Sequence, residues 1–256
     1  MRSLIAFPCA GETLIGTLDA APGRVGLLIV AGGNEIRCGA HRGMALLAAE
    51  VAARGYPAFR YDRRGIGDST GENHGYLSAS DDLAAAATAF RAQAPRLTTI
   101  LAYGNCDAAS TLALFGRAAG LDRLLLANPW TIEEADDLPP AAAIRATYRQ
   151  RLTSPQAWAR LLTGRIDVLK AIRGLRKASS KPPHALAAQV VTAIEGWGNA
   201  ATVLLATGDA TAQAYRAAAR HLPAKAIDTT SHSFAREADQ RQLHDIVLAA
   251  LADAEI

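Results

Sequence analysis

The sequence predicts an α/β protein whose central sheet is mostly parallel and is covered by helices on both faces. The first observation behind this prediction is a regular alternation of short apolar runs, typical of buried strands, with longer runs typical of helices. The second is that polar and reactive residues repeatedly follow the apolar runs directly. In a parallel sheet the carboxyl ends of the strands meet along one edge, where ligands bind. The sequence therefore predicts both the architecture and the edge that carries a site.

The expected strands are short runs rich in β-branched and other apolar residues. The run at residues 25–30 is apolar throughout and leads into two glycines, as expected of a buried parallel strand. Two runs near the N-terminus, residues 4–7 and 13–18, flank Ala10 and Gly11 and are expected to pair as a hairpin. Further strands are expected at residues 57–61, 98–103, 123–127, 202–206 and 225–228.

Longer runs predict helices, at residues 41–54, 80–93, 107–120, 211–220 and 240–251. The first of them is closed by Gly55, a residue typical of helix C-termini. Between residues 129 and 198 the alternation of strands and helices gives way to a mostly helical pattern. We therefore expect a core formed by residues 1–128 and 199–256, interrupted by a helical insertion of residues 129–198.

The composition is that of an ordinary globular protein. The chain has 256 residues, 50% of them hydrophobic, and a net charge of +3. It can bury a sizeable core, and it is not basic enough to indicate a nucleic-acid-binding protein. No apolar run is long enough to span a bilayer or to form the core of a signal peptide, so we expect a cytoplasmic protein.

The three cysteines are Cys9, Cys38 and Cys106, an odd number without the spacing of metal ligands. This pattern argues against both a disulfide framework and a zinc site. A glycine-rich stretch at residues 65–71 lacks the spacing of a dinucleotide-binding loop, and no helix starts directly after it. We therefore expect no metal and no other cofactor.

The stretch Y-G-N-C-D-A-A-S at residues 103–110 is the most informative motif. It lies between an expected strand and an expected helix, and it matches the nucleophile elbow G-x-S-x-G, with Cys106 in the serine position and Ala108 in place of the second glycine. Small residues at both glycine positions permit the sharp turn that holds a nucleophile above the sheet. A helix N-terminus favours the thiolate, which is the reactive form. The alternative is an inert cysteine buried at a strand end.

A cysteine nucleophile needs a base and a group that orients the base. His232 follows the last expected strand, and Asp209 follows the strand at residues 202–206. Both are therefore expected at the same edge of the sheet as Cys106, and the order nucleophile, acid, histidine is a known triad order. Alternatives stay open: Asp228 competes for the acid role, Asp209 could serve as the N-cap of the next helix, and His232 could be a surface histidine.

An acyl-transfer site also needs donors for the negative charge that develops on the carbonyl oxygen. The backbone N–H of Asp107 is one expected donor. The N–H of Gly33 or Asn34, just after the strand at residues 25–30, is the other. The alternative is that the glycines here form only a turn.

The insertion contains a basic, amphipathic segment at residues 145–181. One interpretation is a cap whose apolar stripe covers the site. We then expect Trp130, Tyr148 and Trp158 to lie on the wall over Cys106 and to bind substrate. The other interpretation is a surface for an anionic lipid, an anionic polymer or an acidic acyl carrier.

With these residues identified, the chain resembles the α/β-hydrolase superfamily and, more narrowly, the bacterial family called exosortase A system-associated hydrolase 1. The stretches that carry the resemblance are the two glycines followed by R-C-G-A-H-R at residues 37–42, R-Y-D-R-R-G-I-G-D-S at 60–69, G-N-C-D-A-A-S at 104–110, N-P-W at 128–130, Y-R-Q-R-L at 148–152 and G-D-A-T at 208–211. The chain departs from the family pattern at Cys38, at Ser231 and at N-E-I in residues 34–36, where Pro-Gln-Tyr is more usual.

The resemblance implies an α/β-hydrolase fold with a helical cap at residues 129–198. It also implies a cysteine hydrolase of unassigned substrate, found beside genes for exopolysaccharide production and exosortase-dependent protein sorting. We therefore predict an esterase or thioesterase that cleaves a small-molecule or carrier-bound acyl substrate, with Cys106, His232 and Asp209 as its triad. Two alternatives are an acyltransferase with the same triad and a catalytically weak binding or scaffold protein.

Overall fold

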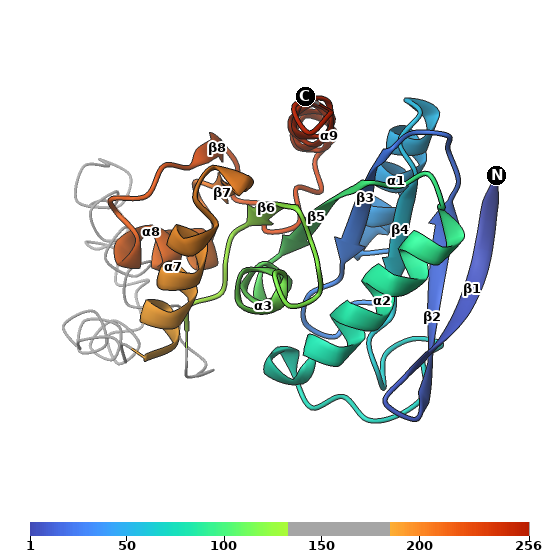
Figure 1. Ribbon diagram of the computed structural model, residues 1–256. Coiled ribbons are helices and arrows are strands. Elements are labelled where there is room, and N and C mark those ends of the chain that lie inside the picture. The colour runs from blue at the N-terminus through green and yellow to red at the C-terminus, as the bar shows by residue number, and fades with distance from the viewer. Residues whose placement is uncertain (133–184, 256) are drawn as a thin grey trace, which may run out of the picture.

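A sheet of eight strands forms the centre of the computed structural model, which describes residues 1–132 and 185–255 (Figure 1). The strands are β1 (Arg2–Cys9), β2 (Glu12–Asp19), β3 (Val25–Val30), β4 (Ala58–Tyr61), β5 (Thr99–Asn105), β6 (Arg123–Ala127), β7 (Ala201–Ala206) and β8 (Lys225–Ile227). Their order is β1-β2-β4-β3-β5-β6-β7-β8. The β1–β2 and β2–β4 pairs are antiparallel, and all pairs from β4 to β8 are parallel. The predicted, mostly parallel sheet is confirmed.

The antiparallel edge is the predicted hairpin. Ala10 and Gly11 connect β1 to β2, and Cys9 faces Glu12 across the turn. Both connecting residues have positive φ values, 50° and 86°. A two-residue turn of this kind matches the right-handed twist of the strands that it joins, so the local sequence alone suffices to form this edge.

Helices cover both faces of the sheet. They are α1 (Gly43–Ala53), α2 (Ser80–Gln93), α3 (Asp107–Phe115), α7 (Ala185–Trp197), α8 (Ala210–Ala218) and α9 (Glu237–Ala252), with short 3-10 turns η1 (Ala40–Arg42), η2 (Tyr76–Ser78) and η3 (Gly198–Ala200). Helices α1 and α9 pack on one face, whereas α2, α3, α7 and α8 pack on the other (Figure 1). Cover on both faces explains why β3 is buried along its whole length and is apolar throughout.

Each face of the sheet has its own hydrophobic core. On the side of α2, the rings of Phe59 and Phe90 stack with their centroids 5.6 Å apart, and both side chains are fully buried. On the side of α9, Ile29 packs in a cluster with Val247. Leu28, the neighbour of Ile29 in β3, belongs to the first core. Successive side chains of a strand point to opposite faces, so the central strands supply both cores.

Four predicted helices have different ends in the structure. Those expected at residues 211–220 and 240–251 are α8 and α9, and the other two are shortened by local turns. The helix expected from residue 41 begins later, because His41 and Arg42 have left-handed backbones with φ values of 53° and 61°. The helix expected to run to residue 120 ends at Phe115. There the N–H of Leu121 donates to the carbonyl of Gly116 at 2.9 Å and closes a turn into β6. In both cases local backbone turns override a pattern that is compatible with a longer helix.

The structure shows only the two ends of the predicted helical insertion at residues 129–198. Residues 129–132 follow β6, and α7 leads back through η3 into β7. Tyr148, Trp158 and the basic segment at residues 145–181 lie outside the described residues. The domain boundaries and the cap therefore stay predictions.

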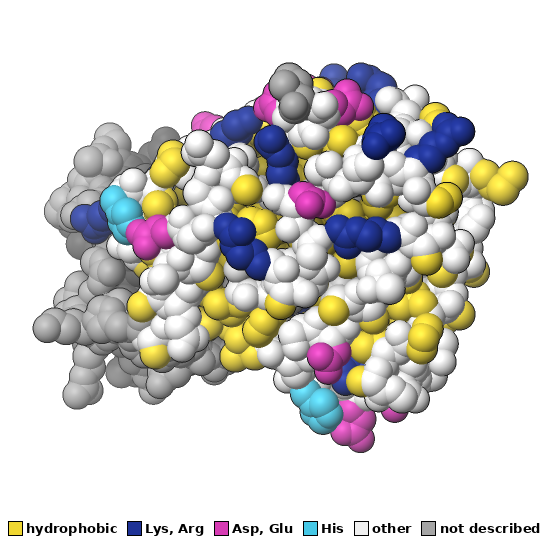
Figure 2. Space-filling model, viewed as in Figure 1, with side chains coloured by type: hydrophobic (Ala, Val, Ile, Leu, Met, Phe, Trp, Pro, Cys, Tyr) yellow, Lys and Arg dark blue, Asp and Glu magenta, His cyan; other side chains and the backbone are white. Residues whose placement is uncertain are grey.

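The surface of the described part carries charges of both signs. On the face formed by α2 and α3, basic and acidic side chains are dispersed among neutral and apolar ones (Figure 2). Within residues 1–132 and 185–255, no helix has the length and apolar character needed to span a membrane.

Candidate active site

Cys106 stands at a sharp turn between β5 and α3. Its backbone has φ 63° and ψ −127°, a conformation that is strained for residues other than glycine and that is characteristic of functional sites. Its N–H donates to the carbonyl of Ala127 at 3.0 Å, and its carbonyl accepts from the N–H of Trp130 at 3.1 Å. The end of β6 and the segment after it therefore hold the strained turn in place.

The small residues around Cys106 are required by close packing. A Cβ atom on Gly104 would lie 2.9 Å from the backbone carbon of Ala108 and 2.9 Å from Cδ1 of Leu112. Ala108 is itself completely buried. Glycine before the cysteine and alanine after it allow β5 and α3 to approach each other, which is the physical basis of the elbow motif.

Three side chains that the sequence places far apart meet at this turn. The Nδ1 atom of His232 lies 2.9 Å from Oδ1 of Asp209, and the imidazole also hydrogen-bonds the sulfur of Cys106. The second carboxylate oxygen of Asp209, Oδ2, accepts the N–H of Ala212 at 2.9 Å and caps α8. Asp209 therefore both caps the helix and contacts the imidazole.

These hydrogen bonds determine the charge of the site. The bonds to the Asp209 carboxylate and to the Cys106 sulfur raise the pKa of His232 from 6.5 to about 10, although burial acts in the opposite direction. Burial would raise the pKa of Asp209, but hydrogen bonds from His232 and from the N–H groups of Ala212 and Thr211 lower it. A carboxylate–imidazolium pair therefore lies beside the sulfur at neutral pH.

Asp228, the competing acid, does not contact the imidazole. Its side chain is exposed and accepts a hydrogen bond from the hydroxyl of Thr207 at 2.9 Å. It lies just beyond the end of β8, whereas Asp209 begins α8. The geometry thus pairs His232 with Asp209 and not with Asp228.

The loop after β3 presents the other predicted oxyanion donors. The N–H of Glu35 donates to the carbonyl of Gly32 at 3.0 Å and closes a turn. The buried guanidinium of Arg63 donates to the carbonyl of Gly33. The N–H of Asn34 has no acceptor in the described part of the chain. These bonds hold the loop and leave the N–H of Asn34 open to another partner.

The side chain of Asp107 contacts this loop. Its Oδ1 atom accepts the N–H of Gly33 at 2.7 Å. A Cβ atom on Gly32 would lie 2.7 Å from the same oxygen and 2.6 Å from the carbonyl oxygen of Asn105. Only glycine at position 32 allows this approach. Asp107 also begins α3, where its own N–H has no acceptor within the helix.

Two asparagines that the sequence analysis did not identify as site residues connect the elbow to the histidine loop. The side-chain nitrogen of Asn105 donates to the carbonyl of His232 at 3.0 Å. Asn128 is completely buried; it donates to Oδ1 of Asn105 at 3.0 Å and accepts the N–H of Ala206 at 2.8 Å. The available signal for Asn128 was the N-P-W stretch at residues 128–130, which carries the family resemblance.

Glu35 is a third site residue absent from the sequence predictions. Burial raises the pKa of its carboxyl group, and the charge of Asp107 adds to the effect. The N–H of Ala40 and the nearby His232 and His41 act in the opposite direction. Glu35 therefore lies close enough to the imidazole and to Asp107 for both to act on its carboxyl group. Its departure from the family pattern was the available signal.

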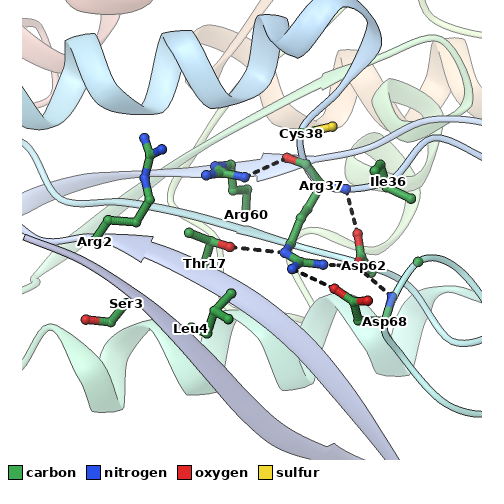
Figure 3. A pocket seen from close by; sticks show the side chains of 11 residues that line it. Arg2, Ser3, Leu4, Thr17, Ile36, Arg37, Cys38, Arg60, Asp62 and Asp68 are labelled. Carbon is green, nitrogen blue, oxygen red and sulfur yellow. Dashed lines mark hydrogen bonds and ion pairs between the residues drawn. The ribbon is translucent and has the colours of Figure 1, made fainter.

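The other end of the same loop borders a cavity of about 340 Å³ (Figure 3). Arg37 forms an ion pair with buried Asp62 and a second one, at 2.8 Å, with exposed Asp68. Its Nε atom also donates to the hydroxyl of Thr17 at 3.0 Å. Arg37 therefore links the loop after β3 to β2 and to the loop after β4. This contact gives Asp62, in the stretch at residues 60–69, a structural role.

The remaining cysteines have other surroundings. Cys9 is buried, and its sulfur donates to Oδ1 of Asp82 at 3.4 Å; burial and this bond raise the pKa of the thiol to about 11. Cys38 is half-buried on the cavity beside Arg37. Among the described residues, no group of His, Cys, Asp and Glu side chains could hold a metal ion.

Trp130 is the predicted substrate-binding residue that the structure describes. It is half-buried, and its carbonyl accepts the hydroxyl of Ser110 at 2.7 Å while its N–H contacts the elbow. Its position next to Cys106 is compatible with a wall of the site. Its role, like those of Tyr148 and Trp158, stays a prediction.

Comparison with known proteins gives matches among solved structures. No protein-family model matches the chain, and no curated protein matches it significantly. An esterase of Pyrococcus furiosus superposes with a TM-score of 0.64 at 12% identity, over 99% of this chain and 91% of that one. The α/β hydrolase GrgF from Penicillium sp. sh18 gives 0.65 at 17% identity, over 98% of both chains.

The chain has the α/β-hydrolase fold. A thioesterase domain from the curacin biosynthetic pathway is also similar, with a TM-score of 0.56 at 14% identity, over 97% of this chain and 99% of that chain. The fold class predicted from the sequence is thus confirmed. The narrower resemblance to the exosortase-associated family stays a prediction.

Proposed function

We propose that this protein is a cysteine hydrolase that cleaves an ester or a thioester through an acyl-enzyme on Cys106. The observation that carries the proposal is the chain of hydrogen bonds from Cys106 through His232 to Asp209, at a strained turn of an α/β-hydrolase fold. Proteins of similar fold include an esterase and a thioesterase domain, which supports the same class of reaction.

Acylation follows from this arrangement. His232 holds the proton of the Cys106 thiol as an imidazolium, and the sulfur forms a bond to the acyl carbon while the carbonyl π electrons move to the oxygen. The N–H of Asp107 and an N–H of the β3 loop bind that oxyanion. As the C=O bond re-forms, the bond to the leaving group breaks. The leaving alcohol or thiol takes the proton from His232.

Deacylation uses the same groups in reverse roles. His232 takes a proton from water, and the resulting hydroxide attacks the thioester carbon. The C–S bond breaks, the carboxylic acid leaves, and the proton taken from water stays on His232 beside the released sulfur. Throughout both steps Asp209 keeps the imidazole oriented, since it holds Nδ1 at 2.9 Å.

The substrate class rests on sequence resemblance alone. The stretches at residues 104–110 and 128–130 resemble a family associated with exopolysaccharide production and exosortase-dependent sorting. We therefore place the acyl substrate in such a system, as a small molecule or bound to a carrier. The enzyme is cytoplasmic in this proposal, and the basic segment at residues 145–181 contacts an anionic partner. The reaction itself is independent of this placement.

Thiol labelling combined with turnover tests the proposal. Limiting iodoacetamide followed by mass spectrometry is expected to label Cys106 first, because buried Cys9 is protected and Cys38 has no imidazole partner among the described residues. Acyl thioesters of increasing chain length should be hydrolysed by the wild type and by Cys38→Ala, and not by Cys106→Ala or His232→Ala.

The outcomes separate the alternatives. Preferential labelling of Cys38, or full turnover in Cys106→Ala, would refute the cysteine assignment. Acyl transfer to an added amine or sugar alcohol in preference to water would identify an acyltransferase with the same triad. Folded protein without selective labelling and without turnover would indicate a scaffold.

A further inference from the structure

The N–H of Gly33 is already occupied in this structure. It donates to Oδ1 of Asp107 at 2.7 Å, a short hydrogen bond to a charged acceptor, which is the stronger kind. An N–H group offers one hydrogen. A substrate oxygen that is to be bound by Gly33 must therefore first displace the carboxylate.

The donor itself is held in place independently of Asp107. The carbonyl of Gly32, in the same peptide unit as the Gly33 N–H, accepts the N–H of Glu35 at 3.0 Å. The carbonyl of Gly33 is held by the buried guanidinium of Arg63. Both peptide units around Gly33 are thus fixed by contacts that do not involve the carboxylate, so the N–H would keep its direction when Asp107 is removed.

We infer that Asp107 blocks the N–H of Gly33, and that the carbonyl oxygen of a substrate must exchange with its carboxylate before Gly33 can act as an oxyanion donor beside the N–H groups of Asp107 and Asn34. This inference rests on the proposed function, because blocking the N–H of Gly33 affects the reaction only if Cys106 is acylated. Asp107 acts here through Gly33 and is a positioning residue. Its backbone N–H and its side chain have opposite effects: the first binds the oxyanion, and the second competes with it.

The Asp107 carboxylate also affects which acyl groups the site accepts. A displaced carboxylate remains beside the site, where its charge already raises the pKa of Glu35. An acyl chain that carries its own carboxylate meets this negative charge, whereas a neutral chain of the same length does not. Asp107 is therefore expected to select neutral acyl groups over anionic ones.

The test uses the N-acetylcysteamine thioesters of butyrate and succinate, which differ in one charge. In Asp107→Ala, kcat/KM for the butyryl thioester should rise about tenfold, since a charge-assisted hydrogen bond no longer has to be broken. The preference for butyryl over succinyl should shrink. Asp107→Asn keeps a neutral acceptor and should show a smaller rise. Asp81→Asn, which changes an acidic residue in the first turn of α2, is the matched control and should leave both values unchanged.

Iodoacetamide labelling is the second readout, because alkylation of Cys106 forms no oxyanion. Its rate should change far less than kcat/KM. If both Asp107 variants are folded and labelled like the wild type but are no faster with the butyryl thioester, the carboxylate does not compete with the substrate oxygen for Gly33. The inference is then refuted, while the proposed function stands. If Asp107→Ala does not fold, Asp107→Asn decides by the same criterion. Absence of Cys106-dependent turnover from the wild type and from every variant would overturn the proposed function and this inference with it.

Discussion

The carboxylate of Asp209 connects His232 to helix α8. Its Oδ1 atom lies 2.9 Å from Nδ1 of the imidazole, and its Oδ2 atom lies 2.9 Å from the N–H of Ala212. One side chain thus caps a helix and holds an imidazole in place. Because the two contacts use different oxygens, substitutions can separate them.

Asp209→Asn is expected to reduce kcat roughly 10³-fold or more and to remove the stabilisation that comes from the raised pKa of His232, while leaving the cap of α8 intact. Asparagine is as good an N-cap as aspartate, but it cannot hold the imidazole as a carboxylate does. Asp209→Ala should lose the same activity and be about 1 kcal/mol less stable than Asp209→Asn, because it also loses the cap. Asp228→Asn is the control, because that exposed carboxylate contacts Thr207 instead. Thioester hydrolysis and urea unfolding measure the two effects. Full activity in Asp209→Asn would remove Asp209 from the mechanism.

The raised pKa of His232 predicts a pH dependence of stability. The pKa is about 10 in the folded protein and 6.5 as the ordinary value. The folded state therefore keeps a proton that the unfolded chain loses. The resulting stabilisation is complete below pH 6.5 and is lost as the pH rises toward 10. Urea unfolding of the wild type and of His232→Gln at pH 6, 8 and 10 measures this. The difference between the two proteins should shrink with rising pH, and a constant difference would contradict the assignment.

Asn128→Ala is expected to destabilise the protein by about 2–4 kcal/mol. The substitution leaves the buried N–H of Ala206 without its acceptor, and it places alanine at a φ value of 43°. The support for the carbonyl of His232 weakens as well. Asn73→Ala removes an exposed bond to Asn34 and should change stability by no more than about 0.5 kcal/mol. Equal unfolding midpoints for the two variants would show that the Asn128 contacts contribute little.

A matched pair of glycine substitutions tests the packing at the elbow. Gly104→Ala should destabilise the protein by about 1–3 kcal/mol, because its Cβ atom would lie 2.9 Å from the backbone of Ala108. Gly196 lies within α7, and a Cβ atom there meets nothing within 4 Å. Gly196→Ala should therefore stabilise the protein by roughly 0.5–1 kcal/mol. Thermal unfolding distinguishes the two directions, and a shift of the same sign in both variants would contradict the packing argument.

The sequence by itself determined the architecture and the chemistry-bearing residues of the elbow. Strand–helix alternation is a local property of side-chain periodicity, so β3, β6 and α2 begin and end where predicted. The elbow around Cys106 could also be predicted from the sequence, because residues close in the chain impose the requirement for small residues at positions 104 and 108. The placement of Asp209 and His232 at one edge followed from the rule that parallel strands end together.

Tertiary structure alone decided how these residues are used. Whether His232 pairs with Asp209 or Asp228 depends on the order of strands in the sheet and on where α8 begins. The contact between Asp107 and Gly33 joins residues 74 positions apart, and no local pattern encodes it. The same holds for buried Asn128, whose hydrogen bonds reach β5, β7 and the histidine loop. Such contacts arise because buried polar groups must find partners wherever the fold brings them together.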